Sequence, residues 1–156
     1  MVGGRAPGVD DLPQLPYTRM VVEETLRLYP PVWAFPRDAI AADEIGGFRV
    51  PKGSMVLSSQ YITHRHPEFW DRPEAFEPER FAPERANGRP RYAYYPFGAG
   101  PRTCIGSHFA LLEAQLILAS VAQCYRLVPV PGRSYQPVSL ATLRPHENIL
   151  MTLTAR

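Results

Sequence analysis

The 18 prolines of this 156-residue chain fall between its periodic segments, and they limit where regular structure can form. A helix is predicted over about 16–28, because the prolines at 30 and 31 push the preceding residue out of the α region. A second helix is predicted over about 105–124, and it is apolar almost all round, so we expect it to be buried. Two helices and a few hairpins, however, hardly supply enough surface to surround it completely. The chain is 45% hydrophobic, which is enough for one packed domain.

The remaining segments predict short strands and one long irregular stretch. Runs such as FRV and SMVL, separated by the turn signals IGG and PKG, predict a small antiparallel sheet over 35–58. The runs VSLATL and ILMTLTA predict two closing strands. Residues 59–95 combine helical turns with a long irregular segment. Such long loops are uncommon in a compact domain unless they wrap around another part of the structure or have a functional role. The predicted class is mainly α with small antiparallel β sheets (α+β).

Composition narrows the classes of partner and the compartment. The net charge is only +2 and Lys52 is the single lysine, so no basic patch argues for nucleic acid. Two cysteines, Cys104 and Cys124, favour a reducing compartment over a disulfide framework. Residues 1–13 are rich in Gly, Pro and Asp and lack the pattern of a signal peptide, so we expect a flexible lead-in before a folded part over 14–156. If the protein is bacterial, we expect it to be soluble and cytoplasmic.

The stretch YPFGAGPRTCIG packs three glycines and two prolines around Cys104, directly before the second predicted helix. Glycines allow sharp turns and close approach to a flat ligand, and the start of a helix favours a thiolate over a thiol. The pattern therefore predicts a nucleophile or a metal ligand at Cys104, whereas Cys124, deep in the apolar helix, is expected to be buried and structural. A cysteine hydrolase is disfavoured because no base is aimed at the sulfur, and a zinc site because no second ligand lies at short spacing.

Charged residues in the first predicted helix form a second pattern. Glu24 falls in the apolar arc of the segment VVEETLRLYPP, with Arg27 beside it. A buried pair of this kind must find further hydrogen-bond partners or become very costly. The PERF stretch offers Arg80 as a third member.

Taken together, FGAGPRTCIG, ETLR and PERF resemble the haem-binding loop, the Glu-x-x-Arg helix and the Arg-bearing loop of the cytochrome P450 superfamily, the haem-thiolate monooxygenases. The resemblance implies the C-terminal haem-binding part of that fold and haem b as the cofactor. It also implies an electron-donating reductase or ferredoxin and a small apolar substrate. The PPVWAF segment resembles a substrate-facing stretch, although simple core packing explains it equally well.

The resemblance also assigns roles to individual residues. Cys104 matches the axial thiolate ligand of the haem iron. Arg102 and Arg37 match residues that pair with haem propionates, the alternative being solvated arginines. Glu24, Arg27 and Arg80 match a buried charge triad that secures the irregular segment and takes no part in the chemistry. Within the loop, Phe97 matches the family's aromatic residue that packs near the sulfur. The glycines that shape the family's loop are matched by Gly98, Gly100 and Gly106.

The chain departs from the family pattern on the distal side of the haem. It has no A-G-x-x-T pattern, and therefore no acid-alcohol pair, so no catalytic residue is assigned. We expect a monooxygenase segment that works together with a missing N-terminal half. The alternatives are a truncated haem-binding module without oxygenase activity, and a haem-free thiolate enzyme or interaction domain.

Overall fold

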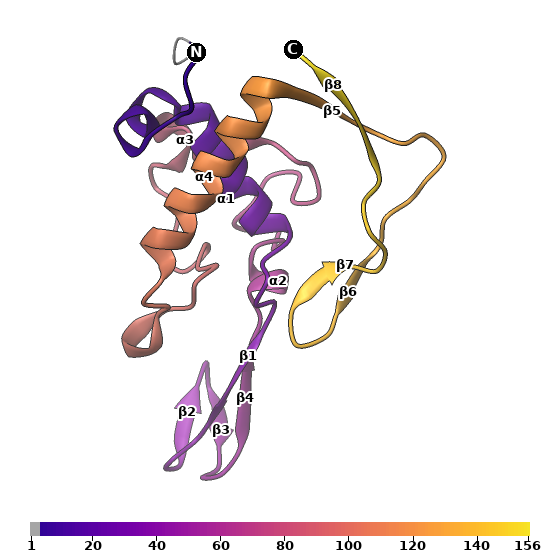
Figure 1. Ribbon diagram of the computed structural model, residues 1–156. Coiled ribbons are helices and arrows are strands. Elements are labelled where there is room, and N and C mark those ends of the chain that lie inside the picture. The colour runs from indigo at the N-terminus through magenta and orange to yellow at the C-terminus, as the bar shows by residue number, and fades with distance from the viewer. Residues whose placement is uncertain (1–3) are drawn as a thin grey trace.

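Two crossing helices form the centre of the computed structural model, which describes residues 4–156 (Figure 1). Helix α1 (Pro16–Leu28) packs against α4 (Ser107–Cys124), and the strands extend from this pair in separate groups. The expected class of helices with small antiparallel sheets is confirmed.

Helix α1 has the bounds that the sequence predicts. Pro16 occupies the first turn, where its missing N–H costs nothing, and the helix ends before the prolines at 30 and 31. Its buried residues are Val22, Glu24, Arg27 and Leu28. At about 3.6 residues per turn, Val22 lies on one side, whereas Glu24, Arg27 and Leu28 share another face, which combines charged and apolar side chains. That face meets the 3₁₀ helix η2 (Pro78–Phe81), which carries the PERF sequence.

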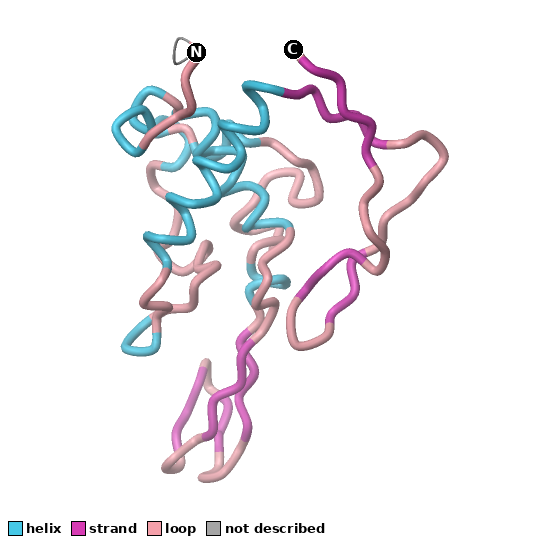
Figure 2. The backbone as a smooth tube through the Cα atoms, viewed as in Figure 1, coloured by secondary structure: helices cyan, strands magenta, loops and turns pink. Residues whose placement is uncertain are grey.

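The strands form two-stranded antiparallel ladders, which Figure 2 shows as separate pairs. β1 (Phe35–Asp38) pairs with β4 (Met55–Ser58), and β2 (Asp43–Ile45) pairs with β3 (Phe48–Val50). The second ladder turns through Gly46 and Gly47, which have φ angles of 58° and 84°. A tight two-residue hairpin needs such positive φ angles, and residues other than glycine rarely adopt them. The small sheet expected over 35–58 is therefore present as two ladders.

The C-terminal strands differ in part from the prediction. VSLATL is not one strand: β6 (Pro137–Ser139) and β7 (Leu143–Pro145) pair with each other across a turn in which the Leu140 N–H donates to the Thr142 carbonyl at 3.2 Å. ILMTLTA does contain a strand, β8 (Met151–Ala155). Its partner β5 (Tyr125–Pro129) directly follows α4, so no turn signal marked it in the sequence.

Short helical turns complete the chain. Residues 1–3 lie outside the described residues, and η1 (Val9–Gln14) places a 3₁₀ helix within the expected lead-in, so the division at residue 13 stays a prediction. Between β4 and α4 the chain forms three further helical turns with irregular segments around them: α2 (Gln60–Thr63), α3 (Pro83–Ala86) and η3 (Gly100–Arg102).

Helix α4 is not buried in this chain, so the expectation of burial is wrong, whereas the expectation that the chain cannot surround it completely is confirmed. Gln115 is its one buried residue, while Phe109 is 69% exposed and Ile117 is 57% exposed. The physical reason is that α1 and η1 pack against α4 and leave its other sides open. Cys124, in the last turn of α4, is exposed as well, so its expected burial is also wrong.

We expect the substitution Ile117→Gln to increase the monomeric fraction of the 156-residue chain, because it removes an exposed apolar side chain. Its neighbour Leu116 is half-buried, so Leu116→Gln should instead lower the free energy of unfolding by about 2 kcal/mol. Size-exclusion chromatography and urea unfolding separate the two effects. If the parent and Ile117→Gln self-associate to the same extent, the exposed face of α4 does not cause the self-association.

Candidate functional site

The loop of residues 95–106 is shaped by glycines and closed by its own backbone. Gly98 and Gly100 have φ angles of +76° and +71°, in the left-handed region that disfavours other residues. The Gly98 N–H donates to the Tyr95 carbonyl at 2.9 Å, and the Cys104 N–H donates to the Phe97 carbonyl at 2.9 Å. These contacts bring Phe97, Gly98 and Cys104 together in one loop that leads into α4.

The surroundings of Cys104 fit a flat apolar group that is held through a metal. The thiol is exposed, and a Cβ built on Gly106 would lie 3.9 Å from its sulfur, so glycine leaves that side of the sulfur clear. Ile105 beside it is fully exposed, and Phe109 lies in the first turn of α4. A soft sulfur donor among uncovered apolar side chains is a donor set that suits haem iron.

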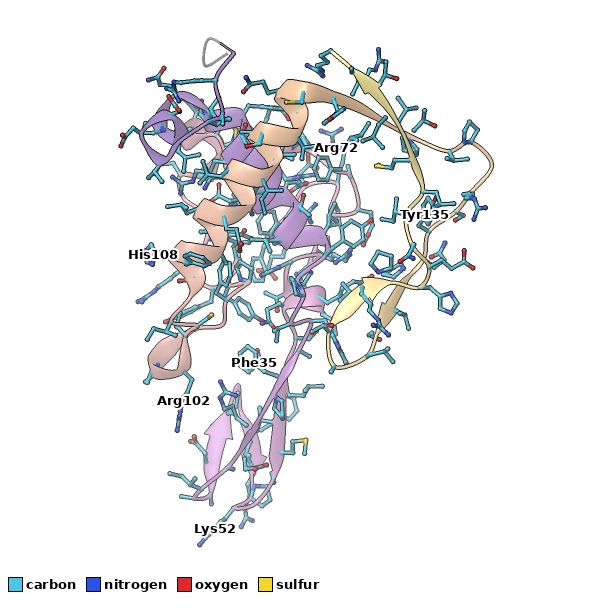
Figure 3. The ribbon with its side chains drawn as sticks, viewed as in Figure 1. Phe35, Lys52, Arg72, Arg102, His108 and Tyr135 are labelled. Carbon is cyan, nitrogen blue, oxygen red and sulfur yellow. The ribbon has the colours of Figure 1, made fainter. Side chains whose placement is uncertain are left out.

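The two arginines expected near the cofactor are both exposed, but they lie on different elements. Arg102 ends η3, and its side chain extends away from α4 (Figure 3). Arg37 lies on β1, where its guanidinium stacks over the Phe35 ring at 4.6 Å and Nη1 donates to the Pro36 carbonyl at 2.8 Å. No contact joins the two arginines in the part of the chain that the structure describes, so each presents its charge separately.

Arg27 lies at the centre of the buried polar network, with no exposed side-chain area. Its Nε donates to Glu24 Oε2 at 2.7 Å and its Nη2 donates to Glu24 Oε1 at 2.9 Å, which makes a bidentate ion pair. The other three N–H groups donate to backbone carbonyls of His64 (2.7 Å), Pro73 (2.7 Å) and Ala75 (3.0 Å). All five donors of the guanidinium are therefore satisfied.

Glu24 joins this arginine to the PERF segment. Glu24 Oε1 accepts the backbone N–H of Glu77 at 2.8 Å and lies 3.4 Å from Nε of Arg80. Arg80 is 3% exposed, and its Nη2 donates to the Arg72 carbonyl at 2.8 Å and lies 3.2 Å from Glu77 Oε2. The structure thus brings Glu24, Arg27 and Arg80 together, with Glu77 as a fourth charged member.

Two further residues, His64 and Tyr95, connect the network to the cysteine loop and were missed by sequence reasoning. His64 is completely buried, and its Nε2 accepts the Tyr95 N–H at 2.9 Å. The Tyr95 hydroxyl lies 2.9 Å from Thr63 Oγ1 and 3.3 Å from Ser58 Oγ. The one signal in the sequence is that Tyr95 opens the glycine-rich stretch; nothing in the sequence joins it to a histidine 31 residues earlier.

Within residues 4–156, no helix is both long enough and apolar enough to cross a membrane.

Over residues 1–153 the chain matches the family described as cytochrome P450. It is 50% identical over 129 residues to cyclooctat-9-en-7-ol 5-monooxygenase of Streptomyces melanosporofaciens, covering 83% of this chain and 28% of that protein. It is 37% identical over 156 residues to pentalenene oxygenase of Streptomyces avermitilis, covering 100% of this chain and 35% of that protein.

The structure is similar to that of retinoic acid-bound cyanobacterial CYP120A1, with a TM-score of 0.93 and 34% sequence identity. This match covers 100% of the chain and 36% of the cyanobacterial protein. The chain therefore spans about a third of the length of the proteins that it matches.

We expect Arg27→Ala to lower the free energy of unfolding by about 3–5 kcal/mol, because it leaves the Glu24 carboxylate buried without its main partner. The matched control is Arg19→Ala on the same helix, which removes an ion pair between the exposed Arg19 guanidinium and the largely buried Glu23 carboxylate and should cost about 1 kcal/mol or less. Urea unfolding followed by circular dichroism measures both. Similar losses in the two variants would contradict a special role for the buried network.

Proposed function

The chain belongs to the cytochrome P450 family, and from this premise we propose that it forms the haem-binding part of a haem-thiolate monooxygenase. Haem is the cofactor of this family, and we propose the b type here, bound without a covalent link to the chain. The single observation that carries the proposal is the exposed Cys104 thiol, presented by a glycine-shaped loop beside uncovered apolar side chains.

In this proposal Cys104 supplies the thiolate that ligates the iron. The bound haem supplies the centre at which dioxygen is activated to oxidise a substrate. Gly98 and Gly106 leave space for the ring next to the sulfur, and Phe97, whose carbonyl accepts the Cys104 N–H, packs against the loop near the sulfur. The chain's own part is to fix the sulfur in position and to keep one face of the group dry.

The exposed arginines have a separate role toward the cofactor. Arg102 follows directly from the glycine turn of the loop, and Arg37 projects from β1, which contacts the start of the loop through Phe35 and Tyr95, with ring centroids 6.4 Å apart. We propose that each guanidinium pairs with one propionate. Arginine suits this role because its planar fork binds a carboxylate through two hydrogen bonds.

The charge network does not touch the reacting atoms in this proposal. Glu24, Arg27 and Arg80 hold the irregular segment of residues 64–80 against α1, and this segment supports the cysteine loop. Their contribution is retention of the fold and of the cofactor.

The substrate and the redox partner are proposed from the relatives. Their names describe an oxygenase of pentalenene and a monooxygenase of cyclooctat-9-en-7-ol, and a structural neighbour binds retinoic acid. We propose a small, largely apolar substrate, which Val32 and Trp33 in the PPVWAF segment would suit. Electrons would come from a reductase or a ferredoxin. Turnover is proposed only for a protein that joins this chain to a distal acid-alcohol pair, and for the chain alone we propose haem binding.

The proposed ligand is tested by the spectrum of the carbon monoxide complex of the reduced, haem-loaded chain. The parent should show the strongly red-shifted Soret band of thiolate ligation, and Cys104→Ala should lose it because no other residue of the loop offers sulfur. Cys124→Ala is the matched control, since Cys124 is also an exposed free cysteine, and it should keep the band. Loss of the band in the control, or its persistence in Cys104→Ala, would contradict the assignment.

A second measurement tests the propionate pairing. Arg102→Leu should release haem about tenfold faster to a globin scavenger, the loss expected for one charge-assisted hydrogen-bonding partner. Arg133→Leu removes another exposed arginine, which lies between β5 and β6, and should leave the rate unchanged. Equal rates of haem release for the parent and Arg102→Leu would show that Arg102 is a solvated arginine that does not pair with a propionate.

A further inference from the structure

The buried imidazole of His64 links the ion network to the cysteine loop. On one side, the His64 backbone carbonyl accepts Arg27 Nη1 at 2.7 Å. On the other side, its ring Nε2 accepts the Tyr95 N–H at 2.9 Å, so the ring must be neutral with its proton on Nδ1. Its Nδ1 has no hydrogen-bond partner among the residues that the structure describes. One residue therefore holds two segments that are far apart in the sequence.

Tyr95 is held at a second point by its hydroxyl. Thr63 Oγ1 donates its single proton to the Ser59 carbonyl at 2.9 Å, so in the 2.9 Å contact between Tyr95 and Thr63 the phenol must be the donor. The same phenol oxygen then accepts from Ser58 Oγ at 3.3 Å. The phenol is thus fixed to the residues around α2, and within residues 4–156 the acceptor for the Tyr95 amide is His64.

Backbone hydrogen bonds continue from Tyr95 to the thiol-bearing residue. The Tyr95 carbonyl accepts the Gly98 N–H at 2.9 Å, and the carbonyl of the intervening Phe97 accepts the Cys104 N–H at 2.9 Å. A change in how Tyr95 is held therefore moves the first turn of the loop, and that turn carries the acceptor for Cys104.

We propose that His64 is a positioning residue for the cysteine loop: its neutral ring anchors the Tyr95 amide, and its protonation releases the start of the loop. The inference rests on the proposed function only in taking Cys104 as the haem ligand. A protonated ring would place an N–H opposite the Tyr95 N–H, so the hydrogen bond would be replaced by repulsion between two donors.

The surroundings of His64 oppose protonation in the docked state, in which the buried ring accepts the Tyr95 N–H. Tyr94 and Tyr95 pack against it, with ring centroids 5.2 and 5.3 Å away, and the charged groups that face it are Arg27 from α1 and Arg65 from the end of α2. Burial, reinforced by these two cations and opposed by the nearby backbone carbonyls of Arg27 and Leu26, lowers the pKa of His64 from its ordinary 6.5 to about 4.

The direction of the pH effect follows from this shift. A released imidazole takes up a proton as the pH falls below 6.5, whereas the docked ring stays neutral down to about 4. The docked state is therefore fully favoured above pH 6.5, and it loses about tenfold in relative population for each pH unit between 6.5 and 4.

Three variants of the haem-loaded protein test the proposal. His64→Gln places an amide oxygen near the position of Nε2 and does not titrate, and His64→Leu removes the acceptor. His66→Gln is the matched control, because His66 is a partly exposed histidine in the same segment. The readouts are the thiolate Soret band of the carbon monoxide complex from pH 8 to pH 4, and amide hydrogen exchange at Tyr95 with and without haem.

The proposal predicts that the parent and His66→Gln lose the thiolate band as the pH falls, and that His64→Gln retains it to a pH about one unit lower. His64→Leu should show a reduced band even at pH 8. Between pH 7.5 and pH 5, protection of the Tyr95 amide should fall by about thirtyfold in the parent and remain constant in His64→Gln.

Three results would overturn the inference: equal acid midpoints for the parent and His64→Gln, a full band in His64→Leu, or His64→Gln behaving like His64→Leu. If the parent shows no thiolate band at any pH, the proposed function fails. The exchange of the Tyr95 amide without haem then decides the role of His64 by itself, since a pH-independent protection factor in the parent contradicts it.

Discussion

The five satisfied N–H groups of Arg27 are the interaction on which the rest of the structure depends. The segment that follows α2 has no ladder or long helix to receive its backbone carbonyls, and buried carbonyls without partners are costly. Arg27 supplies donors to three of them, at His64, Pro73 and Ala75, while Glu24 neutralises its charge and accepts a backbone N–H in turn. A side chain from a regular helix thus takes the place of secondary structure in an irregular segment.

Two sets of contacts lead from Arg27 to other parts of the structure. Through His64 and Tyr95 it reaches the glycine-rich loop, and so the Cys104 thiol. Along the irregular segment, Trp70 is 2% exposed and contacts two guanidinium groups, with Arg27 5.0 Å and Arg89 4.3 Å from its ring centroid. The position of the candidate ligand is therefore set by contacts that begin on α1, nearly 80 residues earlier in the chain.

Local patterns in the sequence predicted the parts of this arrangement that are themselves local. The bounds of α1, the pairing of Glu24 with Arg27 three residues later, and the glycine turn around Cys104 all depend on short spacings. The contact between His64 and Tyr95 could not be predicted, because an ordinary buried histidine gives the same signal. The exposure of α4 could be predicted only in outline: hydrophobicity shows that its surface favours burial, and the small number of other elements shows that the chain cannot cover it completely, but neither says which side chains stay exposed.

A buried ion network gives order to a structure without supplying much of its stability, because removing its charges from water offsets most of the attraction between them. Stability must then come from apolar burial, and in residues 4–156 the buried hydrophobic side chains are few: Val22, Leu28, Trp70 and Ala93. Ile105 and Phe109, on either side of the start of α4, remain uncovered next to the thiol. A flat apolar cofactor on this face would bury such surface and bind only the folded chain, so its binding would stabilise the fold by mass action. In this chain the charged interior therefore defines the shape, and the apolar face around Cys104 is a place where added burial would stabilise it.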